Sequence, residues 1–189
     1  MIRIGIIIGS TRPGRLGESV ARWVHDLAVK RSDAEYEIVD LADYELPHLD
    51  EPVPAAAGQY AREHTKAWSE RIAGYDGFVF VTPEYNHSTS GALKNAIDFL
   101  FHEWADKAAG FVSYGVDGGA RAAEHLRQVL GQLKVADVPA QVTLSLYNDF
   151  ENMSVLRPLP MQEERVTQML DQLIGWAGAL RQLREKDAA

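Results

Sequence analysis

The sequence predicts an α/β protein with a doubly wound, mainly parallel sheet that carries helices on both faces. Residues 4–8 and 78–81 form uninterrupted apolar runs, a composition typical of strands that are covered on both faces. Strand-like and helix-like segments also alternate along the whole chain, which indicates crossover connections between parallel strands. A length of 189 residues without a candidate linker favours one domain over residues 1–189, large enough for a sizeable core.

The first half of the chain predicts three strands separated by two helices. Residues 3–8 are predicted as a strand because they are few, β-branched and followed by a glycine. Residues 18–31 are predicted as a helix, since apolar side chains recur on one of its faces, namely Val20, Trp23, Val24 and Leu27. A second strand is expected at residues 36–40, followed by a proline-rich loop and a helix at residues 59–73. A turn then leads into the third strand, residues 78–81.

The second half continues the alternation. A helix is expected from Gly91, a fourth strand at residues 109–114, and then a helix whose apolar face consists of Leu126, Val129, Leu130 and Leu133. A fifth strand is expected at residues 140–146 and a last helix at residues 163–184. Five strands and five helices in this order fit a flavodoxin-like three-layer sandwich with strand order 2-1-3-4-5. In such a fold, ligands bind at the carboxyl ends of strands one and three.

Composition excludes several classes of function. The formal net charge of −8 argues against nucleic acid as a partner, because phosphate-backbone binding needs a basic face. The chain has no cysteine, so disulfides, a thiol nucleophile and thiolate metal sites are excluded. No apolar run approaches the ~20 residues of a membrane span, and the first residues do not resemble a signal peptide. We therefore expect a cytoplasmic protein that does not enter a membrane.

The loop after the first strand predicts an anion site. It runs from Gly9 through Ser10, Thr11, Arg12 and Arg15 into the first predicted helix. The N–H groups of a helix's first turn have no intrahelical partners, and the helix dipole places partial positive charge there. Hydroxyl groups and arginines can add further hydrogen bonds, and those from arginine are charge-assisted. The expected ligand is a phosphate; the alternative is an ordinary glycine turn with solvated arginines.

The loop does not match two known phosphate-binding motifs, which limits the kinds of phosphate ligand to be expected. Gly9 and Gly14 have the spacing of a Walker A loop, but Leu16 offers no hydroxyl to hold Mg²⁺. The dinucleotide fingerprint fails because Thr11 stands where its second glycine is required. Asp40, at the end of the second strand, would suit a ribose contact, although an acid is common there. The loop therefore favours a monophosphate held without a metal.

Two further loops would open at the same edge of the sheet. After the third strand, the proline-stiffened sequence Pro83-Glu84-Tyr85-Asn86 is expected to present the N–H groups of its last three residues to a flat heteroaromatic ring. After the fourth strand, Ser113-Tyr114-Gly115 and a later pair of glycines would allow close backbone approach to a ligand. Turn chemistry alone is the alternative for each loop. Three such loops at one edge favour a binding site.

These three loops, together with the segment 91–98 of sequence GALKNAID, resemble the NADPH-dependent FMN reductases over residues 3 to 146. The chain departs from the common pattern at Arg15 and Val116, where members often carry Ser and Gly. The resemblance implies that Pro83, Glu84, Tyr85 and Asn86 would hold the isoalloxazine, beside Ser113, Tyr114 and Gly115. It implies that the FMN phosphate would be held by Ser10, Thr11, Arg12, Arg15, Leu16, Gly17 and Glu18.

The resemblance also implies the reaction. An FMN-dependent NAD(P)H oxidoreductase would take hydride from NADPH or NADH onto bound FMN. It would then reduce a small-molecule acceptor in a ping-pong mechanism. The redox chemistry would be that of the cofactor. The acceptor would be a quinone, an azo compound, a metal oxyanion or free flavin. No catalytic side chain is nominated. The alternatives are a flavodoxin-type electron carrier and a phosphate- or nucleotide-sensing module without redox chemistry.

Other motifs predict little chemistry. His102-Glu103-Trp104-Ala105-Asp106 is a near miss of the zinc motif H-E-x-x-H, and we expect no metal site but an exposed helix end. Phe99, Leu100, Phe101 and Trp104 are apolar around more than one helical face. Such a helix is either deeply buried or covered by a partner. Because the family that the chain resembles forms dimers and tetramers, we expect a second subunit to cover it. The expected assembly is a homodimer or homotetramer.

Overall fold

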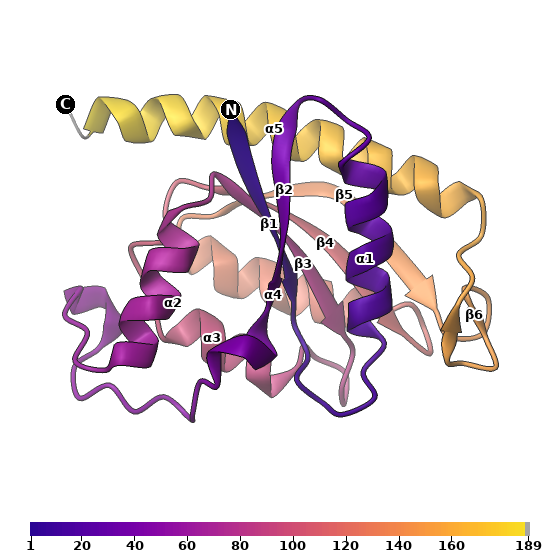
Figure 1. Cartoon of the computed structure of the whole chain (residues 1–189), viewed down its shortest axis with the longest axis horizontal. Coiled ribbons are helices and arrows are strands. Elements are labelled where there is room, and N and C mark those ends of the chain that lie inside the picture. The colour runs from indigo at the N-terminus through magenta and orange to yellow at the C-terminus, as the bar shows by residue number, and fades with distance from the viewer. Residues whose placement is uncertain (188–189) are drawn as a thin grey trace.

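The structure, a computed structural model, describes residues 1–187 and confirms the predicted sheet. Five strands lie in the order β2-β1-β3-β4-β5, and every neighbouring pair is parallel. Their bounds are β1 (Ile2–Ile8), β2 (Ala34–Asp40), β3 (Gly77–Pro83), β4 (Ala108–Gly115) and β5 (Ala136–Ser145). Figure 1 shows the sheet twisting between its helices. The predicted flavodoxin-like order is therefore confirmed.

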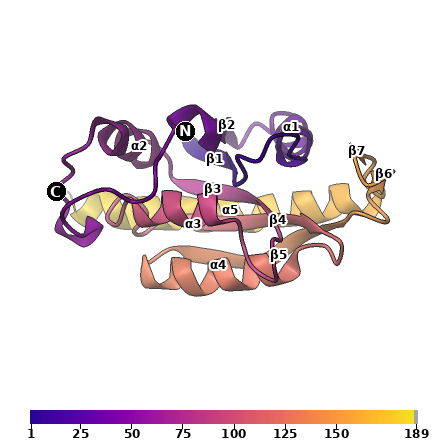
Figure 2. The same cartoon turned by 90° about the horizontal axis from the view of Figure 1, so that it is seen from below.

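Helices cover both faces of the sheet, as Figures 1 and 2 show. One face packs against α1 (Gly17–Ala28) and α5 (Met161–Asp187). The other packs against α2 (Glu63–Ala73), α3 (Gly91–Asp98) and α4 (Ala120–Gln132). Two short 3₁₀ helices, η1 (Leu41–Tyr44) and η2 (Ala55–Ala57), lie in the connection between β2 and α2.

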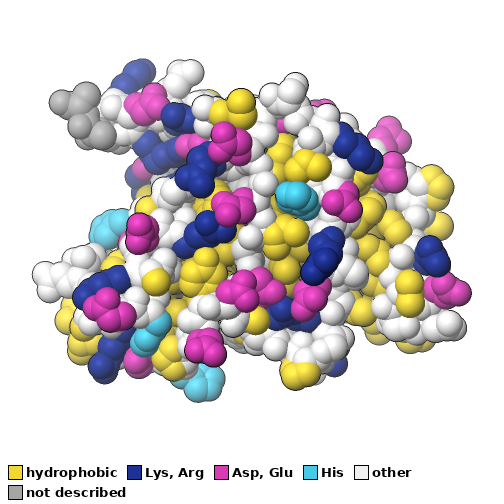
Figure 3. Space-filling view, viewed as in Figure 1, with side chains coloured by type: hydrophobic (Ala, Val, Ile, Leu, Met, Phe, Trp, Pro, Cys, Tyr) yellow, Lys and Arg dark blue, Asp and Glu magenta, His cyan; other side chains and the backbone are white. Residues whose placement is uncertain are grey.

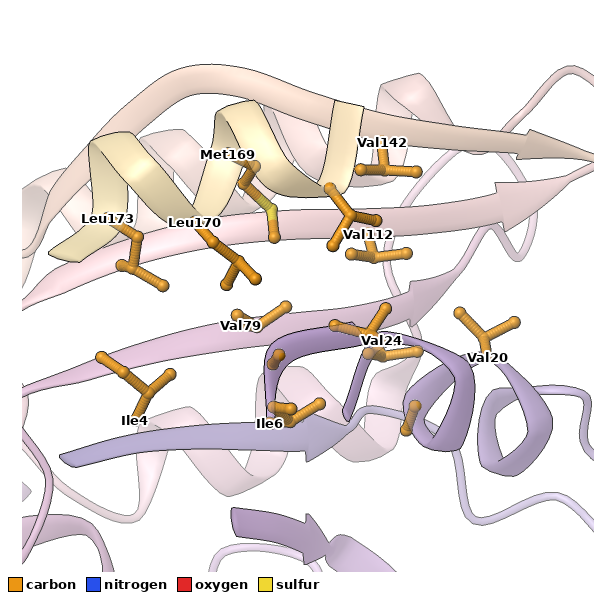
Figure 4. Packing of buried hydrophobic residues seen from close by; sticks show 14 of the residues in the cluster. Ile4, Ile6, Val20, Val24, Val79, Val112, Val142, Met169, Leu170 and Leu173 are labelled. Atoms are coloured by element: carbon orange, nitrogen blue, oxygen red, sulfur yellow. The ribbon is translucent and has the colours of Figure 1, made fainter. Parts of the chain in front are cut away.

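The strands are apolar throughout because each face of the sheet has its own core. Figure 4 shows the first core, in which Ile6, Val79 and Val112 of neighbouring strands meet side chains of α1 and α5. The second core is aromatic: Phe78 and Trp104 pack edge to face with ring centroids 5.0 Å apart. Burial of both faces makes β1, β3 and β4 the rigid platform from which the three predicted loops emerge.

Several predicted boundaries were wrong by a few residues. Helix α1 ends at Ala28 rather than at residue 31, and β5 begins at Ala136 rather than at residue 140. Helix α2 begins at Glu63 rather than at residue 59, for a visible reason. The Glu51 carboxylate accepts the N–H groups of Ala61 (2.8 Å) and Arg62 (2.9 Å), and Arg62 is extended. These two hydrogen bonds hold residues 61 and 62 outside the helix, which therefore begins at Glu63.

Of the two alternatives for the apolar segment from Phe99 to Trp104, the structure shows burial within the chain, although the expected helix is absent. Helix α3 ends at Asp98, and the segment after it is a series of turns rather than a helix. Phe99, Leu100 and Trp104 are at most 1% exposed within this single chain. The Trp104 indole N–H donates to the Ile97 carbonyl oxygen at 3.1 Å. The chain's own second core therefore covers these side chains.

A small hairpin was not predicted. Strands β6 (Phe150–Glu151) and β7 (Val155–Leu156) pair antiparallel after β5. The buried Asp149 carboxylate organises this segment by accepting the N–H groups of Ser145 (2.9 Å) and Leu159 (3.0 Å). Its strands are two residues long, too short for a period-2 pattern to reveal them.

Charged side chains of both signs are interspersed on the face shown in Figure 3, without a large region of one sign. None of the helices in the described part of the chain combines the length and the hydropathy that a bilayer crossing requires.

A buried lysine makes the stability of the fold depend on pH. Lys107 is 4% exposed, and its ammonium group donates to the carbonyl oxygens of Ile72 (2.8 Å) and Ala73 (3.2 Å) at the end of α2. Burial, with a smaller contribution from the nearby Arg184, lowers the pKa of Lys107 to about 7. The ordinary value is roughly 10.4, so between these limits the unfolded chain binds more protons than the folded one. The unfolding free energy contributed by Lys107 therefore rises with pH across this window.

We expect the wild-type unfolding free energy to rise between pH 7 and pH 9 by roughly 2 kcal/mol more than that of Lys107→Met, since one pKa unit corresponds to about 1.4 kcal/mol. Urea unfolding of both proteins at the two pH values measures this difference. Equal pH dependence in the two proteins would contradict the assignment.

Candidate functional site

The loop between β1 and α1 begins with a glycine that the packing requires. The Gly9 N–H donates to the Val81 carbonyl oxygen at 2.8 Å. A Cβ atom at Gly9 would lie 2.8 Å from both that oxygen and the Leu93 side chain, closer than a side chain tolerates. Gly14, in the same loop, has φ +69°, a left-handed conformation that favours glycine. The two glycines therefore let the backbone pass close to β3 and α3 at Gly9 and turn at Gly14 before α1 begins.

Ser10 and Arg12 bring the first loop against the second. The buried Ser10 hydroxyl lies 2.9 Å from the Tyr85 hydroxyl, and Arg12 Nε donates to the same Tyr85 oxygen at 3.3 Å. The predicted meeting of these two loops is thus present in the structure. Arg12 is exposed, and no carboxylate of residues 1–187 lies within ion-pair distance of it. Its positive charge is open to a ligand.

Arg15 occupies a different position from Arg12. Its guanidinium contacts the carboxylates of Asp40 (2.5 Å) and Glu18 (2.7 Å) and donates to the Ser10 carbonyl oxygen at 2.9 Å. Its side chain is only 10% exposed. Two carboxylates already balance the charge of Arg15, so this residue ties the loop to the end of β2. The unbalanced charge of the loop is that of Arg12.

The start of α1 provides donors that the protein leaves unused. Helix α1 begins at Gly17 after Leu16, and no side chain caps it, so the N–H groups of its first turn lack partners within the helix. The Tyr114 hydroxyl is buried beneath this turn, 2.9 Å from where a Cβ of Gly17 would lie, and it has no hydrogen-bond partner within residues 1–187. Burial raises the pKa of Tyr114, which keeps the hydroxyl a neutral donor.

This donor set fits the phosphate of a flavin mononucleotide. An uncapped helix N-terminus, an unmatched arginine and a buried hydroxyl without a partner are the groups that a phosphate dianion satisfies. Helix α3 shows the contrast, because there the Ser90 hydroxyl accepts the Leu93 N–H at 3.1 Å and closes the N-terminus. Thr11, also predicted to bind phosphate, is an exposed residue of the same loop.

The second loop is a tight turn. Tyr85 and Ser88 exchange both backbone hydrogen bonds (2.9 and 3.1 Å), and Asn86 and His87 between them have φ of 49° and 71°. Both angles are left-handed, as in the two-residue turn that joins hairpin strands. Left-handed residues other than glycine are uncommon, although asparagine tolerates this conformation.

The expectation that three consecutive N–H groups of this loop face a ligand was wrong. The Glu84 N–H donates to the Tyr114 carbonyl oxygen at 3.0 Å, and the Tyr85 N–H donates to Ser88. Of the three, only the Asn86 N–H has no partner within the described residues. Pairing with β4 takes the Glu84 donor, and the turn itself takes that of Tyr85.

A buried hydrogen bond within the third loop stabilises it. The Ser113 hydroxyl is fully buried and donates to the Gly118 carbonyl oxygen at 2.9 Å, so this side chain supports the loop instead of facing a ligand. A Cβ at Gly115 would lie 3.3 Å from Glu84 Cβ, which packs the third loop against the second. Gly119 has φ +73° and would place a Cβ 2.8 Å from the Tyr114 nitrogen. Backbone proximity explains both glycines.

A cavity beside the first loop was missed by the sequence analysis. It has a volume of about 290 Å³ and lies between η1 and α3, with Thr11 in its wall. Its other lining residues are Leu41, Ala42, Glu45, Leu46, Ala92, Asn95 and Ala96. The Asn95 side chain fixes the rim by donating to the Pro47 carbonyl oxygen (2.7 Å) and accepting the Leu49 N–H (3.0 Å). Three separate segments build the wall, so no short motif marks it.

The near miss of the zinc motif has structural contacts in this chain. His102 Nε2 lies 2.9 Å from the Ala56 carbonyl oxygen, and the Glu103 carboxylate accepts hydrogen bonds from Tyr60 (2.9 Å) and Ser69 (2.6 Å). Within residues 1–187, no group of three or more metal-ligating side chains is present.

Comparison with known proteins places this geometry in a family. A family model described as NADPH-dependent FMN reductase matches residues 2–149. The NAD(P)H-dependent FMN reductase of Schizosaccharomyces pombe is 44% identical over 158 residues, covering 82% of this chain and 79% of that protein. A quinone reductase of Escherichia coli is 37% identical over 135 residues, covering 68% and 69%.

A solved structure agrees at the level of the fold. The flavoenzyme NAD(P)H:(acceptor) oxidoreductase of Paracoccus denitrificans superposes with a TM-score of 0.73 at 21% identity, covering 95% of this chain and 98% of that one. The family match spans most of the chain and includes all three loops of the candidate site. The chain therefore belongs to the NADPH-dependent FMN reductase family.

Proposed function

We propose that the protein is an FMN-dependent NAD(P)H oxidoreductase that reduces a small-molecule acceptor. The observation that carries this proposal is the donor set at the start of α1, where the exposed Arg12 has no carboxylate partner within residues 1–187 and the helix is uncapped. The names of the relatives, FMN reductase and quinone reductase, support the same reaction. These names favour a quinone or free flavin as the acceptor, while an azo compound and a metal oxyanion stay predictions from the sequence.

The first loop would bind the phosphate of the cofactor, and the second and third loops would bind its ring. The phosphate would be bound by Ser10, Thr11 and Arg12 together with the first N–H groups of α1, while Arg15 keeps their loop in place. The ring would lie against Pro83 to Asn86 and the backbone at Tyr114 and Gly115. FMN held there would supply the redox chemistry, the uptake of hydride from NAD(P)H and the reduction of a second substrate.

The protein's own part in this reaction is to bind and orient. Hydride transfer to a flavin requires no acid or base side chain, and we nominate none. The Asn86 N–H, without a partner within the described residues, is available to the edge of the ring. A fixed N–H dipole there stabilises negative charge without reorganisation. A flavodoxin-type carrier remains the second candidate, and the names of the relatives favour the enzyme over it.

The first experiment is spectroscopic. Purified protein with added FMN is desalted, its visible spectrum is recorded, and NADPH and then NADH are added without oxygen. We expect the flavin to remain with the protein and to bleach with at least one nucleotide. A retained flavin that neither nucleotide bleaches would support the carrier, and a colourless protein would contradict flavin binding altogether.

Arg12→Ala should weaken FMN binding by roughly 1.5–3 kcal/mol, the scale of a hydrogen bond to a charged group. Fluorescence titration of FMN measures this loss. Arg22→Ala is the matched control, because Arg22 is an exposed arginine on α1, beyond its first turn. Equal affinities of the Arg12 variant and the wild type would refute the assignment of Arg12 to the phosphate.

We also infer a homodimer or homotetramer, which rests on the family alone now that Phe99, Leu100 and Trp104 are known to be buried within the chain. Sedimentation velocity at micromolar concentration should give a species of at least twice the monomer mass. A monomer alone would contradict this inference. The cytoplasmic location likewise stays a prediction from the sequence.

A further inference from the structure

The tight turn between Tyr85 and Ser88 is held in place from outside its own sequence. Asn86 and His87 are both left-handed, and the turn lacks the glycine that usually relieves this conformation. Left-handed residues other than glycine carry a conformational cost and persist where the surroundings hold them. The contacts around the turn therefore decide whether it keeps its shape.

Those contacts come from one face of α4. Arg121 and His125 are four residues apart on this helix, so they lie on the same side of it. Arg121 Nε donates to Glu84 Oε1 at 2.6 Å, and His125 Nδ1 lies 2.9 Å from the Ser88 hydroxyl. Glu84 is the residue that precedes the turn, and Ser88 is its last residue. Two residues on one face of α4 therefore bind the segment on both sides of Asn86 and His87.

The ion pair between Arg121 and Glu84 is the stronger of the two contacts. The Glu84 side chain is 10% exposed, and its second carboxylate oxygen is buried without a partner within residues 1–187. Arg121 also pairs with Asp117 at 2.8 Å, one turn before it, which orients the guanidinium. Removing Arg121 would leave a largely buried carboxylate without a cation, which is strongly unfavourable.

The contacts of α4 with the turn also affect the loop between β1 and α1. The residue after Glu84 is Tyr85, whose hydroxyl contacts Ser10 at 2.9 Å and Arg12 at 3.3 Å. A continuous path of contacts therefore runs from α4 through the turn to Arg12. A shift of the turn would move both the Asn86 N–H and the hydroxyl that supports Arg12.

We propose that Arg121 and His125 are positioning residues for the flavin site, which they serve by fixing the turn from Glu84 to Ser88. The inference rests on the proposed function, since the turn is there assigned to the ring of FMN. Neither residue needs to touch the cofactor. Both act through the side chains that bracket the turn, with Arg121 the principal one.

The test compares Arg121→Ala, Arg121→Lys and His125→Ala. FMN dissociation constants and bound-flavin spectra are measured at temperatures at which each apoprotein is folded. We expect Arg121→Ala to weaken FMN binding on the order of tenfold, a usual scale for coupled neighbours, and to shift the bound-flavin spectrum. Arg121→Lys should restore part of both, because it keeps the charge but loses the planar fork. His125→Ala should have a smaller effect in the same direction.

Arg31→Ala is the control for a general loss of stability. Arg31 also pairs with two carboxylates, Asp33 (2.5 Å) and Asp171 (2.6 Å), but it lies before β2, at the opposite edge of the sheet. This variant should lower the melting temperature and leave FMN affinity and spectrum unchanged. If Arg121→Ala does not fold, the double variant Glu84→Gln/Arg121→Gln removes both charges together and carries the same expectation.

The outcomes separate the two proposals. Wild-type FMN affinity and spectrum in the Arg121 variants, with Arg12→Ala weakened, would overturn the positioning role and leave the proposed function standing. An equal loss of affinity in Arg31→Ala would overturn it as well. Wild-type protein that binds no FMN would overturn both proposals.

Discussion

The close approach of β1 to β3 and α3 at Gly9 is the constraint on which the site depends. The Gly9 N–H bonds to β3 through Val81, and its carbonyl oxygen accepts the hydroxyl of Ser90 at the start of α3. Any side chain at this position would collide with Val81 and Leu93. Because β1 and β3 part here toward helices on opposite faces, their loops open at the switch point of the sheet. The two loops then meet through Ser10 and Tyr85.

Pairing of charges explains how an acidic protein can leave one arginine available to an anion. The chain carries a net charge of −8, and most arginines near the loops are already paired, as Arg15 is with Asp40 and Arg121 with Glu84. Arg12 is left without a carboxylate within residues 1–187, beside a helix start that no side chain caps. A phosphate would supply both the missing charge and the missing acceptors. Paired arginines thus build the loops, and the unpaired one is available to the ligand.

The sequence predicted those parts of the molecule that depend on local pattern. Buried strands, amphipathic helices and the three loops follow from periodicity and turn residues, and the strand order follows from their alternation. Contacts between distant residues were beyond it. Glu51 shortens α2, Asp40 neutralises Arg15, and the second core buries Trp104. For the same reason, the sequence could not show that the Glu84 N–H donates to the carbonyl oxygen of Tyr114. Such partners are chosen by the folded arrangement rather than by neighbours in the chain.

The most direct test of the phosphate site is the ratio of the affinities for FMN and riboflavin, which differ only in the phosphate. Titration of the wild-type apoprotein with each ligand, under the same conditions, measures this ratio. If Arg12 and the start of α1 hold the phosphate, FMN should bind at least about 100-fold more tightly, the scale of two charge-assisted hydrogen bonds. Equal affinities for the two flavins would show that the phosphate is not bound at this loop and would contradict the assignment of the site.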